Sequence, residues 1–230
     1  MGLGMLMEQD HSARAILISQ EAFINSILVH FNLTNATPLL TPLAPSMQLT
    51  NANCPQTQDE KDEMATRPYR ELVGALAWLA LGTRPDIAYT TSSLTHFSHN
   101  PGCVHWEATK RILRYLKGTR GWKLTLGGKM VQIAGSTDAD WGSDQDNRRL
   151  IDVYIVKIRD RAISWKSKKQ TSVALSLTEA KYMALCQVAK ELIWMVDFLK
   201  DLSVSVQDSM VSNADNQGSI ALAKNPVFHN

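Results

Sequence analysis

Residues 135–147 read GSTDADWGSDQDN and directly follow the apolar, strand-like run MVQIA. This stretch places four aspartates, Asp138, Asp140, Asp144 and Asp146, within nine residues. Aspartate is a poor strand former and like charges repel one another, so folding alone gives no reason to gather them. The pattern predicts that a positively charged group binds here.

The composition indicates a soluble globular protein with one large domain or two small ones. The chain has 230 residues, of which 44% are hydrophobic and 20% are charged. No apolar run approaches the ~18 residues that a membrane span needs, and no basic leader precedes an apolar block at the N-terminus. We therefore expect an intracellular protein, in the cytoplasm or the nucleus, that does not contact membranes. The three cysteines are widely spaced, which argues against a disulfide framework.

Basic residues gather on either side of the acidic stretch, although the net charge is only +2. Residues 105–123 hold six Lys or Arg against one Glu, and residues 147–169 hold eight against two acids. A helix over 106–117 would place four cations on one face and apolar residues on the other, and three lysines follow the predicted strand AISW. The candidates for contact with nucleic-acid phosphates are Lys110, Arg111, Arg114, Lys117, Lys166, Lys168 and Lys169. A merely solvated basic surface is the alternative.

The first half of the chain is predicted to be a hairpin, a helix, an irregular segment and a helical bundle. Residues 3–7 and 15–19 are predicted strands, and 20–31 is a predicted amphipathic helix. Residues 34–68 hold five of the eight prolines and the cluster DEKDE, which predicts an exposed linker with little structure of its own. Three helical segments between residues 69 and 119 then predict a small bundle.

The second half changes to the periodicity of strands. The runs KLTL, VQIAGST, VYIVKI and AISWKS predict an antiparallel meander. A long helix follows over 177–201, with Ser176 or Thr178 as its N-cap. The order of the elements predicts that a short strand near 210–214 pairs in parallel with the VQIAGST strand.

The predicted helix over 177–201 is apolar around most of its circumference. A helix of this kind is normally covered on two sides, so we expect it to lie between the sheet and another element. We expect Trp194 on this helix, and Trp78 in the first half, to belong to the hydrophobic core and not to a base-stacking surface.

Three acidic residues stand at comparable places in the predicted elements. Asp138 and Asp215 lie at strand ends, and Glu179 lies in the first turn of a helix. Carboxylate oxygens from separate elements suit Mg²⁺, and a pair of such ions activates water and stabilises the leaving oxygen of a phosphodiester. The residues therefore favour metal-assisted phosphodiester hydrolysis, and scattered, unrelated acids are the alternative.

Five motifs of the chain resemble, in order, the C-terminal part of the Pol polyprotein of copia-type retrotransposons. They are YRELVGALAWLALGTRPDIAY, HWEATKRILRYLKGT, STDADWGSDQDNRR, AISWKSKKQTSVALSLTEAKYMAL and ADNQGSIALAKNPVFH. The resemblance implies a reverse-transcriptase segment following the palm (1–33), a linker (34–68), a helical thumb and connection (69–121) and an RNase H-like domain (122–230). The implied fold is α/β, with an RNase H-like mixed sheet and flanking helices, preceded by an α+β N-terminal part.

The resemblance also implies roles for the carboxylates. Asp138 would be the metal ligand of the first strand, Glu179 that of the helix and Asp215 that of the fourth strand, with Asp140 as the alternative to Asp138. The cofactor would be Mg²⁺, with Mn²⁺ possible, and the substrate an RNA–DNA hybrid or duplex, with the rest of a Pol protein as a partner. The remaining aspartates of the opening stretch fit a hairpin turn.

The chain departs from the family pattern at several points. The polymerase aspartates lie upstream of this chain and the fourth carboxylate of the domain lies beyond Asn230, so we expect no polymerase activity and a truncated RNase H-like domain. LIDVY replaces a small-residue segment, and Arg159 to Arg161 replace a glycine turn. Lys181 replaces a usual acid and would compete with a metal near Glu179. We therefore expect weak hydrolysis, and the alternative is an inactive remnant that binds nucleic acid or has no function.

Four residues between 96 and 105 could suggest zinc: His96, His99, Cys103 and His105. Their spacing matches no standard zinc site, so we expect them to be structural.

Overall fold

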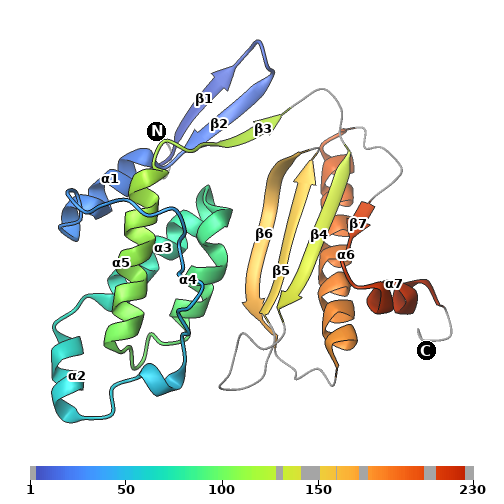
Figure 1. Cartoon of the computed structure of the whole chain (residues 1–230). Coiled ribbons are helices and arrows are strands. Elements are labelled where there is room, and N and C mark those ends of the chain that lie inside the picture. The colour runs from blue at the N-terminus through green and yellow to red at the C-terminus, as the bar shows by residue number, and fades with distance from the viewer. Residues whose placement is uncertain are drawn as a thin grey trace. The chain divides into compact units, whose positions relative to one another are not determined.

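The computed structural model describes residues 4–127, 132–158, 160–170, 176–204 and 211–225, and for residues 138–140 and 177 it describes the backbone alone. The chain divides into two compact units (Figure 1). The helical unit comprises Met1–Gln9 and Ile16–Leu124, and the sheet unit comprises Asp10–Ala15 and Thr125–Asn230.

The predicted N-terminal hairpin is confirmed. It consists of β1 (Leu6–Asp10) and β2 (Ala15–Ser19), and α1 (Glu21–His30) follows it. The strand expected from KLTL forms as β3 (Leu124–Gly127), but it belongs to a sheet of order β1-β2-β3. Its assignment to the later meander was therefore wrong, since a short strand carries no local signal of which strand it pairs with.

The helices α3 (Tyr69–Gly82), α4 (Ala88–Thr95) and α5 (Cys103–Gly118) form the core of the helical unit together with α1. A 3₁₀ turn, η2 (Pro85–Ile87), connects the first two helices. The fully buried side chains that α3 and α5 contribute are Leu72, Leu76, Leu79, Ile112, Leu113 and Leu116. The apolar periodicity of these segments thus predicted the bundle correctly.

The segment expected to have little structure of its own contains a 3₁₀ turn, η1 (Asn51–Asn53), and the helix α2 (Gln58–Ala65). The backbone N–H of Glu60 donates to the Thr57 hydroxyl at 3.3 Å, and the N–H of Thr57 donates to the Glu60 carboxylate at 3.1 Å. This is a reciprocal cap, and acids in a first turn favour a helix. The expectation for this segment was therefore wrong over 58–65, because the DEKDE cluster was interpreted as a solvated linker.

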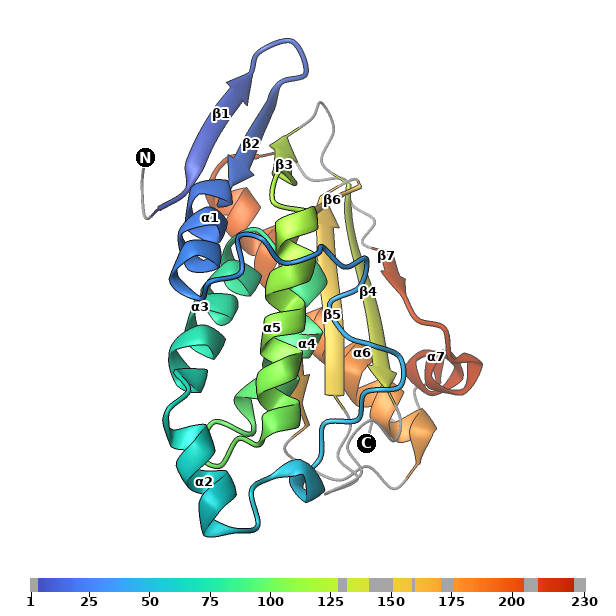
Figure 2. The ribbon, with the colours of Figure 1, turned by 60° about the vertical axis from the view of Figure 1, so that its left-hand side comes forward.

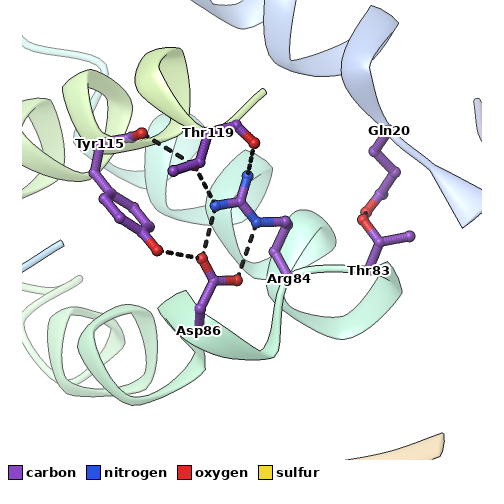
Figure 3. A network of polar contacts seen from close by, with 6 residues as sticks. All are labelled: Gln20, Thr83, Arg84, Asp86, Tyr115 and Thr119. Atoms are coloured by element: carbon purple, nitrogen blue, oxygen red, sulfur yellow. Dashed lines mark hydrogen bonds and ion pairs between the residues drawn. The ribbon is translucent and has the colours of Figure 1, made fainter. Parts of the chain in front are cut away.

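A buried arginine joins the segment after α3 to the end of α5 (Figure 3). The Arg84 side chain is 2% exposed, and its guanidinium donates to both carboxylate oxygens of Asp86 at 2.7 and 3.0 Å. It also donates to the carbonyl and the hydroxyl of Thr119 at 3.2 and 2.5 Å. The Tyr115 hydroxyl donates to Asp86 at 2.8 Å, and the rings of Tyr115 and Trp122 lie 5.6 and 5.5 Å from the guanidinium carbon. A charge this deeply buried is tolerated because it is paired and hydrogen-bonded.

Next to this network, the Thr83 hydroxyl donates to the Gln20 side-chain oxygen at 2.7 Å (Figure 3).

Burial raises the pKa of Tyr115 to about 12, and its hydrogen bond to Asp86 adds to the effect. The phenol is therefore a neutral donor at physiological pH.

The sheet unit contains a four-stranded sheet of order β6-β5-β4-β7. Its elements are β4 (Ile133–Asp140), β5 (Ile151–Ile158), β6 (Arg161–Lys169), α6 (Leu177–Asp201), β7 (Val211–Asn213) and α7 (Gln217–Lys224). β4, β5 and β6 are antiparallel neighbours, and β7 pairs with β4 in parallel. The predicted position of the last strand is thus confirmed.

Helix α6 runs along one face of this sheet (Figure 1, Figure 2). Val188, Leu192 and Met195 of the helix pack on Ile133 and Val156 of the sheet. The approach is closest at Gly135 of β4. A Cβ built there would lie 2.6 Å from Val188 Cγ2 and 3.0 Å from Leu192 Cδ1, so the helix packs where β4 has no side chain.

One side of the second half of α6 is exposed in the described part of the chain. Trp194 is 56% exposed and stacks on Phe198 with ring centroids 5.4 Å apart, and Ile193 and Leu202 are exposed beside them. The expectation of a helix buried on two sides, with Trp194 in the core, was therefore wrong, as was the core assignment of Trp78, which is 37% exposed. Among the described residues no helix combines the length and apolar character that a membrane span requires.

The first prediction concerns Arg84. Replacing it with Met keeps the apolar stem but leaves the partly buried Asp86 carboxylate without its cation. We expect the helical unit to lose roughly 3 kcal/mol of unfolding free energy, near the lower end for a broken buried ion pair. Urea unfolding followed by circular dichroism measures this, with Arg120→Met as an exposed control that should stay within about 0.5 kcal/mol of the parent chain. Equal losses in the two variants would contradict a special role for Arg84.

The second prediction concerns Gly135. Replacing it with Ala puts a methyl group into the closest helix–sheet contact, at a cost of roughly 1–3 kcal/mol. Adding Val188→Ala makes room, so the double variant should be more stable than the sum of the single changes predicts. The measurement is a double-mutant cycle by urea unfolding. The control is Gly121→Ala, where an added Cβ meets no atom within 4 Å; additive single effects would show that the contact is not strained.

Candidate metal and nucleic-acid site

Two predicted metal ligands closely follow the paired part of the two parallel strands β4 and β7. The last paired residues are Ser136 of β4 and Asn213 of β7. Asp138 follows Ser136 by two positions, and Asp215 follows Asn213 by two positions. The carboxyl ends of parallel neighbours lie at one edge of a sheet, so these two aspartates follow strand ends at the same edge.

The first turns of α6 and α7 lie next to the other predicted ligand, Glu179, and next to Asp215. The Ser176 hydroxyl accepts from the N–H of Glu179 at 3.1 Å, which settles the predicted choice of N-cap in favour of Ser176. The Asn216 side chain caps α7 through the N–H of Ser219 at 2.8 Å. Gly218 lets α7 approach α6 closely, because a Cβ there would lie 3.0 Å from Thr178 Cγ2. Figure 1 shows α7 beside α6.

A lysine of α6 binds the Asp215 carboxylate. Lys181 Nζ lies 2.6 Å from Oδ1 and 2.7 Å from Oδ2. The Lys181 side chain is only 15% exposed, whereas that of Asp215 is 64% exposed. The hydrogen bond from Lys181 holds the pKa of Asp215 below its usual value.

The described side chains do not form a metal centre. Both oxygens of Asp215 are engaged by the ammonium group, and no cluster of three or more His, Cys, Asp or Glu side chains suitable for a metal occurs in the described part of the chain. The side chains of Asp138 and Asp140 lie outside the described residues, as do Asp144 and Asp146. The residues as placed therefore do not fit a metal ion at Asp215.

The three predicted phosphate-binding lysines of β6 line a small cavity. Lys166, Lys168 and Lys169 surround a volume of about 120 Å³ together with Asp152 and Gln170. In the antiparallel register, Lys168 lies opposite Asp152. Lys166 and Lys168 are exposed, and neither has a hydrogen-bond partner among the described residues. Their ammonium groups are thus available to an anion.

A buried amide fixes the floor of this cavity. Gln170 is 4% exposed, and its Nε2 donates to Asp152 Oδ1 at 2.5 Å and to the Ala180 carbonyl at 3.3 Å. These two acceptors fix the orientation of the amide, which leaves Gln170 Oε1 buried without a described donor. Burial raises the pKa of the Asp152 carboxyl. The cavity therefore combines a polar floor with a cationic rim.

The predicted basic face of α5 exists, but another segment of the same chain lies against it. Arg111 donates to the Thr41 hydroxyl at 2.9 Å, Arg114 to the Thr37 carbonyl at 2.8 Å and Lys117 to the Ala36 carbonyl at 2.8 Å. Lys110 forms an ion pair with Glu107 at 2.6 Å. Three of the four cations on this helix face thus hold residues 36–41, and the fourth is paired within α5.

The residues that could suggest zinc have structural contacts. His105 is fully buried, its Nδ1 accepts from the N–H of Gly102 at 2.9 Å, and its ring stacks on Phe97 at 3.9 Å. Arg67 donates to the Cys103 sulfur at 3.6 Å. The contacts of His105 and Cys103 confirm a structural role for these two residues.

Comparison with known proteins identifies the relatives of this chain. It is 44% identical to the retrovirus-related Pol polyprotein from transposon TNT 1-94 of Nicotiana tabacum over 227 residues, which cover 99% of the chain and 17% of the polyprotein. It is 38% identical to the corresponding protein of transposon RE1 of Arabidopsis thaliana, over 92% of the chain and 14% of the polyprotein. It is 35% identical to the corresponding protein of transposon RE2 of Arabidopsis thaliana, over 97% of the chain and 15% of the polyprotein. The chain belongs to the family of retrovirus-related Pol polyproteins from transposons. It spans about a sixth of their length. No family profile and no solved structure matches it.

Sequence reasoning missed one residue of this candidate site and described another only in part. Gln170 directly follows KSKK at the end of a predicted strand, and no local pattern marks it as the buried link from β6 to α6. Lys181 was recognised as a cation near Glu179, but its binding to Asp215, which lies 34 residues further along the chain, depends on the packing of α7.

Proposed function

We propose that the chain is the C-terminal part of a copia-type Pol polyprotein, with a segment that follows the reverse-transcriptase palm (1–33), a linker (34–68), a helical thumb and connection (69–121) and an RNase H-like domain (122–230). The similarity to Pol polyproteins over almost the whole chain supports this assignment. The order of three antiparallel strands, a long helix, a parallel strand and a helix in the last part supports the RNase H-like domain.

The proposed activity of this domain is weak, metal-dependent hydrolysis of RNA in RNA–DNA hybrids. The observation that supports it is the parallel pairing of β4 with β7, because Asp138 and Asp215 each follow the last paired residue of their strand by two positions. Asp215 is also bound by Lys181, two residues after Glu179 on α6. These three carboxylates would hold Mg²⁺ or Mn²⁺, with Asp140 as the alternative to Asp138. The metal would supply an activated water and stabilise the leaving oxygen.

The hybrid itself would be held by the chain's own cations. Lys166 and Lys168 are unpaired among the described residues and project at the edge strand β6, with Lys169 adjacent. Contacts of lysines with phosphates position a duplex without selecting its sequence. On α5, a hybrid would have to displace residues 36–41 from Arg111, Arg114 and Lys117 before these could reach phosphates. We therefore assign the larger share of binding to β6.

An inactive remnant that binds nucleic acid remains the second candidate. The bond between Lys181 and Asp215 favours it, because this bond occupies a proposed ligand. The two candidates predict the same binding and differ in cleavage.

The third prediction separates the two basic regions. In the double variant Lys166→Ala, Lys168→Ala, each lost phosphate contact should reduce the log–log salt slope of hybrid binding by about 0.9, and so by about 1.8 in total. Fluorescence anisotropy over a salt series measures the slope. The matched control, Lys190→Ala on α6, should leave it unchanged. A slope that persists in the double variant, but falls on charge reversal of Lys110, Arg111, Arg114 and Lys117, would move the contact to α5.

The fourth prediction concerns cleavage. A hybrid with a labelled RNA strand should be cleaved slowly in Mg²⁺ or Mn²⁺, and Asp138→Asn should reduce the rate to background while leaving hybrid affinity within about twofold. The reason is that this change removes a metal ligand but no phosphate contact. Gel analysis of the RNA strand gives the rate. Loss of cleavage in Asp140→Asn instead would assign the ligand role to Asp140, and no cleavage by the parent chain would favour the inactive remnant.

A further inference from the structure

The α6–α7 junction holds a cation of the chain's own where the proposed function needs a metal. An ammonium group has three donors, and two of those on Lys181 are directed at the two oxygens of Asp215. Charge-assisted bonds of this length are the strong class of hydrogen bond. Asp215 is thus already neutralised by a positive group.

The fold positions this pair in advance. The Lys181 side chain is 15% exposed, so its stem is packed and has lost most of its rotamer freedom. The contact of Gly218 with Thr178 fixes the start of α7 against α6, and Asn216 caps α7 directly after Asp215. The ammonium group therefore returns to Asp215 after each opening without an entropic cost comparable to that of an exposed pair.

We infer that Lys181 is an internal cation that competes with Mg²⁺ for Asp215, so that replacing Lys181 strengthens the binding of this metal at that carboxylate. The inference rests on the proposed function, because it concerns the same carboxylates.

The competition favours the tethered cation. A group attached to the same chain acts at an effective concentration on the order of millimolar or higher, and a packed stem raises it further. Mg²⁺ gives up its waters reluctantly and relies on one or two carboxylates, so the loss of Asp215 removes a large part of its site. An opposite charge held next to a carboxylate changes its proton affinity by about ten- to a thousandfold. We therefore expect a change of at least about tenfold in the apparent dissociation constant of Mg²⁺.

The fifth prediction tests this with the full chain and four variants. Lys181→Met keeps the apolar stem and removes the charge, Lys181→Glu adds a carboxylate, Lys181→Arg keeps the cation, and Lys190→Ala removes an exposed charge elsewhere on α6. The measurement is the midpoint of thermal unfolding against MgCl₂ at constant ionic strength, together with calorimetric titration of Mg²⁺. Circular dichroism verifies that each variant is folded.

We expect a saturable rise in the midpoint for the Met and Glu variants, because a ligand that binds only the folded state stabilises it. The parent chain, Lys181→Arg and Lys190→Ala should need at least about tenfold more Mg²⁺ for the same rise. Adding Asp215→Asn to Lys181→Met should abolish the gain, which would show that Asp215 is part of the new site. A parent chain that binds Mg²⁺ as tightly as Lys181→Met, or a Met variant that gains nothing, would overturn the inference.

The same variants distinguish a failure of this inference from a failure of the proposed function. A gain of Mg²⁺ affinity in Lys181→Met without any hybrid binding would leave the role of Lys181 intact and refute the proposed function. Hybrid binding by the parent chain, without a gain of Mg²⁺ affinity in Lys181→Met, would refute the role of Lys181 and leave the proposed function intact.

Discussion

The contact of α6 with β4 at Gly135 is the constraint on which the sheet unit depends. Val188 and Leu192 occupy the space where any other residue would carry a side chain, which fixes both the height of the helix over the sheet and its position along β4. Because α6 is a straight element of 25 residues, this one contact also determines where its first turn lies. The position of Glu179 and Lys181 relative to the ends of β4 and β7 therefore follows from packing far from the carboxylates themselves.

A second close approach, of Gly218 to Thr178, completes the arrangement. It places the start of α7 against the same first turn and so brings Asp215 within reach of Lys181. Helix–sheet and helix–helix packing both depend here on a missing side chain. Two glycines, which carry no functional group, therefore allow the packing that positions the charged residues Lys181 and Asp215.

Several cations of the described chain are paired with groups of the same chain. Arg84 is bound by Asp86 and Thr119, the cations of α5 are bound by residues 36–41 and by Glu107, and Lys181 is bound by Asp215. Buried or half-buried charges need such partners, since desolvation without compensation is costly. Lys166 and Lys168 differ because they project from an edge strand into water, where a cation needs no partner. An edge strand with exposed lysines also resists pairing with another sheet.

The sequence by itself determined the elements and much of their order. Apolar periodicity predicted the three helices of the bundle, and capping chemistry and unbroken periodicity predicted a helix over 177–201, the bounds at which α6 forms. The order of the elements predicted that β7 lies beside β4. Only the tertiary structure decided that β3 joins the first sheet, that α2 forms in the expected linker, that Trp194 is exposed, and which groups bind Lys181, Gln170 and the cations of α5. The reason is physical: periodicity and caps act between residues a few positions apart, whereas the partner of a polar side chain is set by segments that only packing brings together.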